Sequence, residues 1–364
     1  MSADRGREAE RDTIAVYESR AREWEAARAP SPNDAARFAS RVGAGNTPVL
    51  DLGCGPGGHL SAFRAPKVGL DATFAFLERV RELDPAAGAV QADLARLPFR
   101  RATFGSVWAN KSLVHLARSD LPMALWDLHR VLRPGSPVFL GLFAGDQEHG
   151  PVEHDDFPGR SFSLWPDDLL GAVLEGAGLG DVSIGRSSGR RPTLSVDATR
   201  APTLADTVGP GMRMLCVGLN PSPYAAEVGV GFARPGNRFW PAAIAAGVVT
   251  RDRDPEHALR AHGVGMTDLV KRPTARADAL SRDEYRDGVE RLRTVVSWLA
   301  PSAVCIVGLA GWRAAVDRRA TTGWQPEPLG GRPVYVMPNP SGLNAHDTVD
   351  SLAAHLRLAA EGAD

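Results

Sequence analysis

The feature that most constrains the fold is an alternation of short apolar runs with amphipathic segments. In the first half of the chain, the runs "VLDLG", "KVGLDA", "GAVQAD", "SVWAN" and "PVFLGLFA" are separated by stretches such as "LPMALWDLHRVL". Runs of this length are typical of buried strands, so the alternation predicts βαβ units and a mostly parallel sheet. The stretch "DVSIGRSSGRRPTLSVDATR" is typical of a hairpin that closes this sheet.

The alternation begins again after residues 200–203, with "MRMLCVGLN", "AVCIVG" and "PVYVMPNP". A chain of 364 residues is long enough for two domains that each bury a core. We therefore predict an α/β chain with two domains, residues 1–200 and 201–364, joined by a linker of only a few residues.

Composition is that of a globular protein, with 43% apolar and 23% charged residues. No stretch approaches the roughly 20 apolar residues that span a bilayer, and the N-terminus lacks a signal-peptide core, so a soluble cytoplasmic protein is expected. Cys54, Cys216 and Cys305 stand alone in apolar runs, which predicts buried thiols and neither disulfides nor a metal site. The net charge of −1 means that a nucleic-acid partner would need a local basic face.

A first candidate site lies in "VLDLGCGPGGHL", a strand that leads into a glycine-rich turn and a helix. Gly53, Gly55 and Gly58 fit the pattern GxGxxG, which is a weak signal alone, and Asp71 ends the next strand, where a carboxylate can accept ribose hydroxyls. Asp51 precedes the glycines, where it would repel a pyrophosphate but suits an ammonium and a sulfonium. We therefore favour S-adenosylmethionine over NAD.

Residues 12–200 then resemble class I S-adenosylmethionine-dependent methyltransferases. "DLGCGPGG" is similar to the first motif of that family, "HRVLRPGSPVFLGLF" to its helix-turn-strand ending, and "YESRAREWEAAR" to its N-terminal lid. The alternatives are a helix-dipole role for Asp51 and a solvated loop for Asp93. The resemblance implies a Rossmann-like sheet, with Asp93 at the adenine and cofactor contacts from Asp51, Gly53, Gly55, Gly57, Asp71, Asp93 and Leu94.

The methyl acceptor is left open by the sequence. After the fourth strand, "SVWANKSLVHL" lacks the Asn/Asp-Pro-Pro-aromatic motif of enzymes that methylate DNA amino groups, and no Pro-Cys nucleophile is present. Lys111 and His115 lie where a substrate would enter, with helix capping or solvation as the alternative role. A modified base, a nucleotide, RNA or an unrelated metabolite all stay possible acceptors.

A second candidate site begins at Asn220, directly after the strand "MLCVGL". A second strand leads into Asn-Pro-Ser at residues 339–341, and parallel strands would bring both loops to one rim of the sheet. One Asn-Pro after a strand is usually only a turn. Two such loops on one rim predict a site.

Residues 201–364 resemble the mismatch-specific uracil/thymine-DNA glycosylases of the uracil-DNA glycosylase superfamily, in "GLNPS", "GFARPGNRFWP", "TDLVKRPT" and "NPSGLN". The resemblance implies a three-layer α/β/α domain that needs no cofactor. By the same resemblance, Asn220 would orient the attacking water, Phe232 would stack on the flipped base, and Leu219 and Asn339 would also bind the base. Ser222 and Pro223 depart from the glycine-hydrophobic pair that usually follows Asn-Pro.

The loop "NPSGLN" would enter double-stranded DNA. A base must leave the stack before its glycosidic bond can be attacked, and an apolar side chain such as Leu343 can fill the gap. The alternative is that Leu343 packs beneath the next helix. Ser341, the backbone near Gly342, and Asn344 would contact the DNA strand. Ala345 and His346 replace an arginine common in the family.

Basic residues near this rim complete the prediction. Arg238 is a candidate phosphate contact, with a buried structural pairing as the alternative, and Asn237 is a candidate helix cap. Lys271 and Arg272 would supply local positive charge, with a solvated loop as the alternative.

The sequence as a whole predicts a glycosylase for mispaired uracil or thymine in duplex DNA, fused to a methyltransferase of unknown acceptor. Two alternatives stay open: a first domain that binds cofactor or a partner without catalysis, and a second domain that only reads mispairs. The sequence leaves the oligomeric state open.

Overall fold

The computed structural model describes residues 3–28, 32–42, 45–64, 66–342 and 344–362. The chain forms two compact units, one of residues 1–171 and 179–201 and the other of residues 172–178 and 202–364. None of the helices in the described ranges is long and apolar enough to cross a membrane.

The first unit is built on one mixed sheet with the strand order β3-β2-β1-β4-β5-β8-β7, and β6 pairs with β5 beside this path. The strands β1 to β5 are mutually parallel, whereas β8 runs antiparallel to both β5 and β7. This confirms the predicted βαβ units and the closing hairpin. The strands are β1 (Val49–Leu52), β2 (Lys67–Asp71), β3 (Gly88–Gln91), β4 (Ser106–Asn110), β5 (Pro137–Ala144), β6 (Leu164–Trp165), β7 (Leu179–Arg186) and β8 (Thr193–Arg200).

Aromatic packing fixes the centre of this sheet. The Trp108 ring on β4 stacks on the Phe139 ring of β5, with 4.1 Å between centroids, and Phe38 packs against both rings. The three side chains are almost completely buried, so their apolar area contributes strongly to folding. The helices are α1 (Ala3–Ala27), α2 (Pro32–Arg41), α3 (Phe74–Leu83), α4 (Leu121–Val131) and α5 (Asp167–Gly176).

The second unit has a five-stranded sheet with the order β10-β9-β11-β13-β12. Its first four members are parallel, and the short β12 is antiparallel to β13. The strands are β9 (Met214–Gly218), β10 (Val264–Asp268), β11 (Ala303–Val307), β12 (Gly323–Trp324) and β13 (Val334–Met337). The helices are α6 (Pro223–Val228), α7 (Phe239–Ala245), α8 (Pro255–His262), α9 (Arg282–Leu299), α10 (Leu309–Ala315) and α11 (Val349–Glu361).

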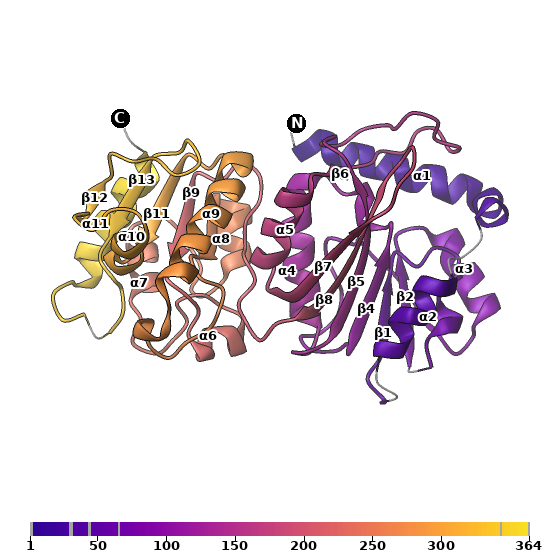
Figure 1. Ribbon diagram of the computed structural model, residues 1–364, viewed down its shortest axis with the longest axis horizontal. Coiled ribbons are helices and arrows are strands. Elements are labelled where there is room, and N and C mark those ends of the chain that lie inside the picture. Colours follow the sequence, from indigo (N-terminus) through magenta and orange to yellow (C-terminus); the bar gives the residue numbers. More distant parts are fainter. Residues whose placement is uncertain (1–2, 29–31, 43–44, 65, 343, 363–364) are drawn as a thin grey trace. The chain divides into compact units, whose positions relative to one another are not determined.

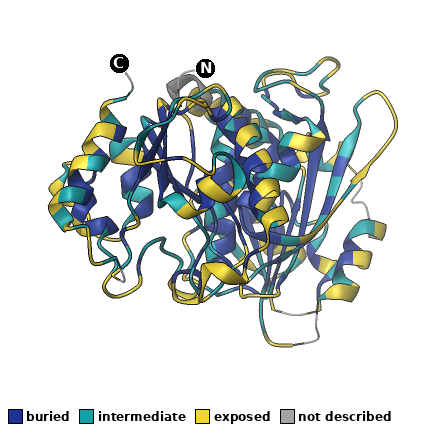
Figure 2. Ribbon diagram, turned by 60° about the vertical axis from the view of Figure 1, so that its left-hand side comes forward, coloured by how far each residue is buried: buried dark blue, intermediate teal, exposed yellow. Residues whose placement is uncertain are grey.

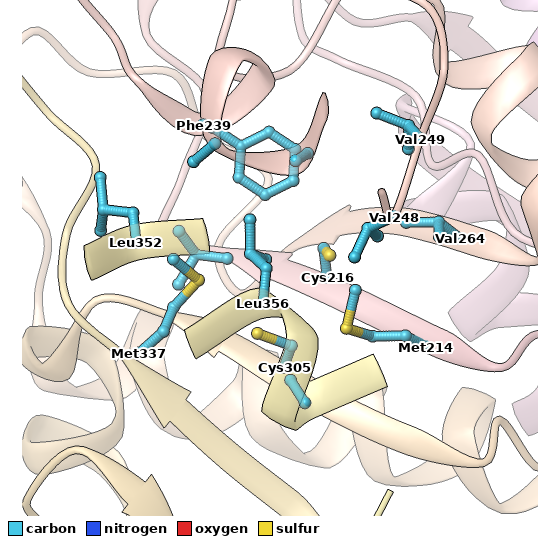
Figure 3. Close-up of a cluster of buried hydrophobic side chains, with 14 of the residues drawn as sticks. Met214, Cys216, Phe239, Val248, Val249, Val264, Cys305, Met337, Leu352 and Leu356 are labelled. Carbon is cyan, nitrogen blue, oxygen red and sulfur yellow. The ribbon is translucent and has the colours of Figure 1, made fainter. Parts of the chain in front are cut away.

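Helices cover both faces of this second sheet, as predicted for three layers. On one face, Phe239 of α7 and Leu352 and Leu356 of α11 pack on strand residues in a buried cluster that Figure 3 displays. Helices α9 and α10 pack on the opposite face. Figure 2 shows that burial follows the strands, while the exposed residues lie on outer helix surfaces and loops. All three cysteines are buried and free, as predicted.

The parallel arrangement places the two Asn-Pro-Ser loops at one edge. In register, Gly218 of β9 lies beside Asp268 of β10, and Val307 of β11 lies beside Met337 of β13. The carboxyl ends of these strands therefore meet the same edge, and the chain continues from them into Asn220 and Asn339.

Candidate functional sites

The glycine turn of the first unit can be formed only by residues without a Cβ. Gly53, Gly55 and Gly57 have φ angles of 71°, 54° and 86°, in the left-handed region. A Cβ on Gly53 would lie 2.1 Å from Cβ of Ser112, which is too close for any side chain. Because position 53 has no side chain, the end of β1 can contact the loop that contains Ser112, and the backbone of the glycine turn stays open to a ligand.

Two carboxylates flank this turn, the buried Asp51 and the half-buried Asp71. Asp71 accepts hydrogen bonds from the N–H groups of Gly55 and Thr73, each at 2.9 Å. Asp51 is 1% exposed, and its Oδ2 has no hydrogen-bond partner in the described structure. Burial, with a further effect of Asp71, raises the pKa of Asp51 to about 8. A buried carboxylate oxygen without a donor is costly, so this site fits a ligand that brings an ammonium group.

A cavity of about 1150 Å³ opens above the glycine turn. Gly58 lines the cavity, whereas Gly57 is not among its lining residues, and a Cβ at position 57 would lie 3.0 Å from Val80 and 3.2 Å from Leu60. The contact between Gly57 and the cofactor stays a prediction. The other predicted cofactor residues that line it are Asp51, Gly53, Gly55, Asp71, Asp93 and Leu94.

Helix α1 contributes Tyr17 to the cavity wall. The Tyr17 hydroxyl lies 2.8 Å from Nε2 of His115 and accepts a hydrogen bond from Arg160 at 2.8 Å. On the other side of the ring, Nδ1 of His115 donates to the Ser161 carbonyl at 2.8 Å. Burial lowers the pKa of His115 to about 4, so the imidazole is neutral at physiological pH. Its Nε2 therefore accepts a hydrogen bond from the Tyr17 hydroxyl.

The predicted entrance residue Lys111 also lines this cavity. It follows β4 directly and has a left-handed φ of 59°, which is unusual for a residue with a Cβ. Strained conformations of this kind concentrate at ligand sites. Both predicted entrance residues, Lys111 and His115, therefore lie on the cavity wall.

In the second unit, the amide of Asn220 is held by its nitrogen. Its Nδ2 donates to Oγ1 of Thr274 at 2.8 Å and to the carbonyls of Arg272 and Pro221 at 3.0 and 3.2 Å. The Thr274 hydroxyl in turn donates to the Arg276 carbonyl at 2.8 Å, which fixes its lone pairs toward Asn220. The Oδ1 of Asn220 is therefore the atom available to accept a hydrogen bond from water.

The segment after β10 keeps this loop in place. The N–H groups of Leu269 and Val270 donate to the carbonyls of Gly218 and Leu219 at 2.8 and 2.9 Å, which extends the β9–β10 pairing. Farther along, Thr274 N donates to the Pro221 carbonyl at 3.1 Å. The motif "TDLVKRPT" thus serves as a backbone clamp on the Asn220 loop.

Phe232 provides an aromatic face near the end of β9. Its ring stacks on Phe239 with 4.2 Å between centroids and 21° between planes, and its φ of 58° is left-handed. A Cβ on Gly218 would lie 3.4 Å from Phe232 Cζ and 2.6 Å from Oδ1 of Asp268. Glycine at this strand end therefore lets the Asp268 carboxylate approach, while the ring would tolerate a Cβ.

The loop after β13 is a self-contained turn. Oδ1 of Asn339 accepts from Ser341 N at 2.9 Å, and Nδ2 of Asn344 donates to the Asn339 carbonyl at 2.9 Å and to Asp347 at 2.8 Å. Both asparagine side chains are thus engaged in shaping the loop. Hydrogen bonds within the loop therefore engage the Oδ1 of Asn339 and the amide protons of Asn344.

The tip of this loop is open to solvent on one side. Gly342 is exposed, and a Cβ there would meet the Gly236 carbonyl at 2.8 Å, so the tip packs closely on the turn before α7. Leu343, the predicted wedge, lies outside the described residues.

Arg238 acts as a brace for the loop, which corrects the prediction of a phosphate contact. Its N–H donates to the Pro340 carbonyl at 2.9 Å, and its guanidinium donates to the carbonyls of Ser341 at 2.9 Å, Asn344 at 2.5 Å and Asp347. The structural alternative is therefore the one observed. The neighbouring Asn237 accepts from Phe239 N at 2.9 Å, which forms an Asx turn one residue before the N-cap Arg238, so the prediction that Asn237 caps α7 is wrong.

The predicted basic pair is also placed differently. Lys271 is buried, and its Nζ lies 2.6 Å from Oδ1 of Asp206, so it offers no solvent-facing charge. Arg272 forms two hydrogen bonds with Glu284, at 2.6 and 2.9 Å, and this pairing lowers the pKa of Glu284 to about 2. The charge of both basic groups is compensated within the domain.

Two residues with a place in these sites, Thr274 and Asp268, lie in the motif "TDLVKRPT" but were not predicted as site residues. Thr274 lies far from Asn220 along the chain, and nothing local marks it as the partner of that amide. Asp268 is buried beside Gly218, and its pKa is raised to about 6 by burial, despite the opposing effect of Lys271. Its place in the motif "TDLVKRPT" is the signal that could have drawn attention to it.

The family comparisons match the two units separately. Residues 50–140 match the model of a methyltransferase domain, and residues 205–359 match the model of the uracil DNA glycosylase superfamily.

Among solved structures, one similar protein is the 1,6-didemethyltoxoflavin-N1-methyltransferase of Burkholderia thailandensis, at 17% identity and a TM-score of 0.45 over 55% of this chain and 92% of that chain. A putative methyltransferase of Bacillus halodurans has 16% identity and a TM-score of 0.37, over 46% and 99% of the two chains. The phosphoethanolamine N-methyltransferase 2 of Haemonchus contortus has 18% identity and a TM-score of 0.39, over 52% and 57%. The chain thus joins a methyltransferase domain to a domain of the uracil DNA glycosylase superfamily.

Proposed function

We propose that residues 201–364 form a glycosylase that hydrolyses the N-glycosidic bond of mispaired uracil in duplex DNA. The observation that carries this proposal is the amide of Asn220, which is anchored through Nδ2 and leaves Oδ1 at the carboxyl edge of the sheet. An amide oxygen can orient a water molecule but is too weak a base to deprotonate it. Bond cleavage therefore depends on stabilising the departing base.

Backbone N–H groups near Leu219 and Phe232 would supply that stabilisation, since fixed donors are most effective where charge develops. Phe232 would stack on the flipped base, and Leu219 and Asn339 would complete its pocket. We expect slow turnover, with uracil leaving more readily than thymine. The small side chains of Ala225 and Ala226 favour some tolerance of the thymine methyl group.

The loop of residues 339–344 would enter the duplex. Among its described residues, the carbonyls of Ser341 and Asn344 accept from Arg238, and Asn344 donates to the Asn339 carbonyl. Ser341 and the amides near Gly342 would hold a phosphate, while Leu343 would occupy the space of the flipped base.

For residues 1–200 we propose methyl transfer from S-adenosylmethionine. The cofactor, when bound, supplies a methyl group on a sulfonium. Asp51 would pair with its ammonium, Asp71 would accept the ribose hydroxyls, and Asp93 and Leu94 would contact the adenine. Tyr17, whose hydroxyl donates to the neutral His115, would face the methyl acceptor on the cavity wall. Both activities would be cytoplasmic.

Single-turnover cleavage of labelled duplexes tests the glycosylase. Duplexes with U·G, T·G or U·A are incubated with wild type and Asn220→Ala, followed by alkali to break abasic sites. We expect wild type to cleave U·G, and the variant to lose at least about a hundredfold in rate. If wild type cleaves none of the duplexes but binds U·G, the domain is a reader of mispairs instead. Circular dichroism of both proteins excludes unfolding as the cause.

A further inference from the structure

Helix α1 forms a roof over the cavity of the first unit. Figure 1 shows α1 lying across one end of the sheet. Its Glu18 accepts a hydrogen bond from Ala75 N, at the start of α3, at 3.1 Å. Toward the other side, Thr13 accepts from Ser161 N at 3.0 Å. The helix is thus held at both flanks of the cavity.

The roof limits the size of what can bind below it. Sites for small molecules usually measure about 300–1,000 Å³, so a cavity of about 1150 Å³ accommodates a cofactor and one further small molecule. A polynucleotide that presents a flipped base would have to pass its flanking backbone beneath a helix that is tied down on both sides. The geometry therefore favours a small methyl acceptor.

The wall away from the cofactor residues is aromatic and basic. The Arg191 guanidinium carbon lies 5.7 Å from the centroid of the Phe143 ring and 5.9 Å from that of Phe162. All three side chains line the cavity. One Arg191 nitrogen donates to the Glu153 carbonyl at 2.9 Å, which fixes the guanidinium over the two rings.

No carboxylate of the described residues lies within ion-pair distance of Arg191. Arg160, on the same wall, differs in this respect because it is paired with Asp155. A partly buried guanidinium whose remaining donors face a cavity is suited to a carboxylate or phosphate, which it can bind through two parallel hydrogen bonds.

We propose that the methyl acceptor is a small molecule with a carboxylate or phosphate group, bound beneath α1 by Arg191 against Phe143 and Phe162. This inference rests on the proposed methyl transfer and names its substrate class. Nucleic acid is then the substrate of the second domain alone.

The test uses the full chain with S-adenosylmethionine labelled in its methyl group. The small-molecule acceptors come from a cell extract filtered below about 1 kDa, which an anion exchanger divides into a retained and an unretained fraction. DNA, RNA and protein are tested as separate pools. The variant is Arg191→Gln, and the matched control is Arg190→Gln, which removes an exposed neighbouring charge outside the cavity wall. Calorimetric titration with S-adenosylmethionine monitors the cofactor site independently of transfer.

We expect the wild type to transfer label to the retained small-molecule fraction. Arg191→Gln should lower the rate of this transfer about tenfold or more, and Arg190→Gln should leave it unchanged. All three proteins should bind the cofactor equally. Label in DNA, RNA or protein would leave methyl transfer standing but overturn the small-molecule acceptor. Label only in the unretained fraction, or equal transfer by the two variants, would overturn the anionic group. Cofactor binding without label in any pool would reject methyl transfer itself, and this inference with it.

Discussion

Asn220 and Thr274 are joined by a hydrogen bond of 2.8 Å, in which the amide nitrogen donates to the hydroxyl oxygen. The hydroxyl proton is already committed to the Arg276 carbonyl. Thr274 can therefore only accept from Asn220, and it selects the orientation of the amide in which Oδ1 faces outward. A reversed amide would place two acceptors against each other and would present donors to the water.

The first prediction concerns this selection. Thr274→Val keeps the shape of the side chain but removes the acceptor, so the rate of U·G cleavage should fall about tenfold or more, whereas Thr274→Ser should stay within about threefold of wild type. The measurement is single-turnover cleavage at saturating enzyme, with duplex affinity determined separately. If valine and serine have the same effect, Thr274 merely fills space and does not position Asn220.

The second prediction separates a brace from a phosphate contact at Arg238. Arg238→Met leaves three carbonyls without their donor, so the free energy of unfolding should fall by about 1–3 kcal/mol. The dependence of duplex affinity on salt should keep its slope, because no phosphate contact is lost. Arg234→Met, in the same loop and exposed, should leave stability unchanged. A slope that decreases by about one in Arg238→Met would return this residue to the DNA interface.

The third prediction follows from the buried Asp51. Its pKa of about 8 in the folded protein lies above the ordinary value of 3.8, so the folded free protein holds a proton there at neutral pH. A cofactor ammonium pairs with the ionised form, and its binding should release this proton. Affinity for S-adenosylmethionine should therefore increase between about pH 6 and about pH 7.5, by at most about tenfold per pH unit.

Calorimetry in two buffers of different ionisation enthalpy measures both the affinity and the proton release. Asp51→Asn should bind the cofactor more weakly and lose the pH dependence. Asp93→Asn, at the adenine end, should weaken binding but keep that dependence. Affinity that stays constant with pH in wild type would mean that Asp51 is not the ammonium partner. Since the folded pKa is the higher one, the unfolding free energy from this group should also decrease as pH rises from about 4 toward 8.

The fourth prediction concerns the glycine at the end of β9. An alanine at position 218 would place its Cβ 2.6 Å from Oδ1 of Asp268, so the carboxylate must shift, whereas Phe232 at 3.4 Å would be in ordinary contact. We expect Gly218→Ala to lower the unfolding free energy by about 1–3 kcal/mol and to slow U·G cleavage. Gly231→Ala, whose Cβ would meet Leu204 at an ordinary 3.5 Å, is the control for chemical denaturation. Equal stability of the two variants would contradict the crowding at Gly218.

Much of the fold follows from local pattern. The apolar runs that become β1, β2, β4 and β5, and those that become β9, β11 and β13, are short, continuous and bounded by turn residues, which is how a strand buried on both faces is recognised. The glycines of the first turn are also a local signal, because a left-handed backbone conformation favours glycine whatever packs around it.

Side-chain roles at the sites depended on contacts that no local pattern records. Arg238 and Lys271 look alike in sequence, as cations beside a loop, yet one donates to the carbonyls of residues 341, 344 and 347 and the other is buried against Asp206. Whether a cation faces solvent is decided by the elements packed around it, and these come from distant parts of the chain.

By itself, the sequence determined the two mostly parallel sheets, the order of their strands along the chain and the positions of Asp51, Asn220 and the two Asn-Pro-Ser loops. These depend on hydrophobic periodicity and turn chemistry, which act over a few residues. Only the tertiary structure decided that Thr274 holds the amide of Asn220 and that Arg238 braces the loop of residues 339–344. Each depends on a hydrogen bond between groups far apart in the chain, and such a bond exists only once packing has brought donor and acceptor together.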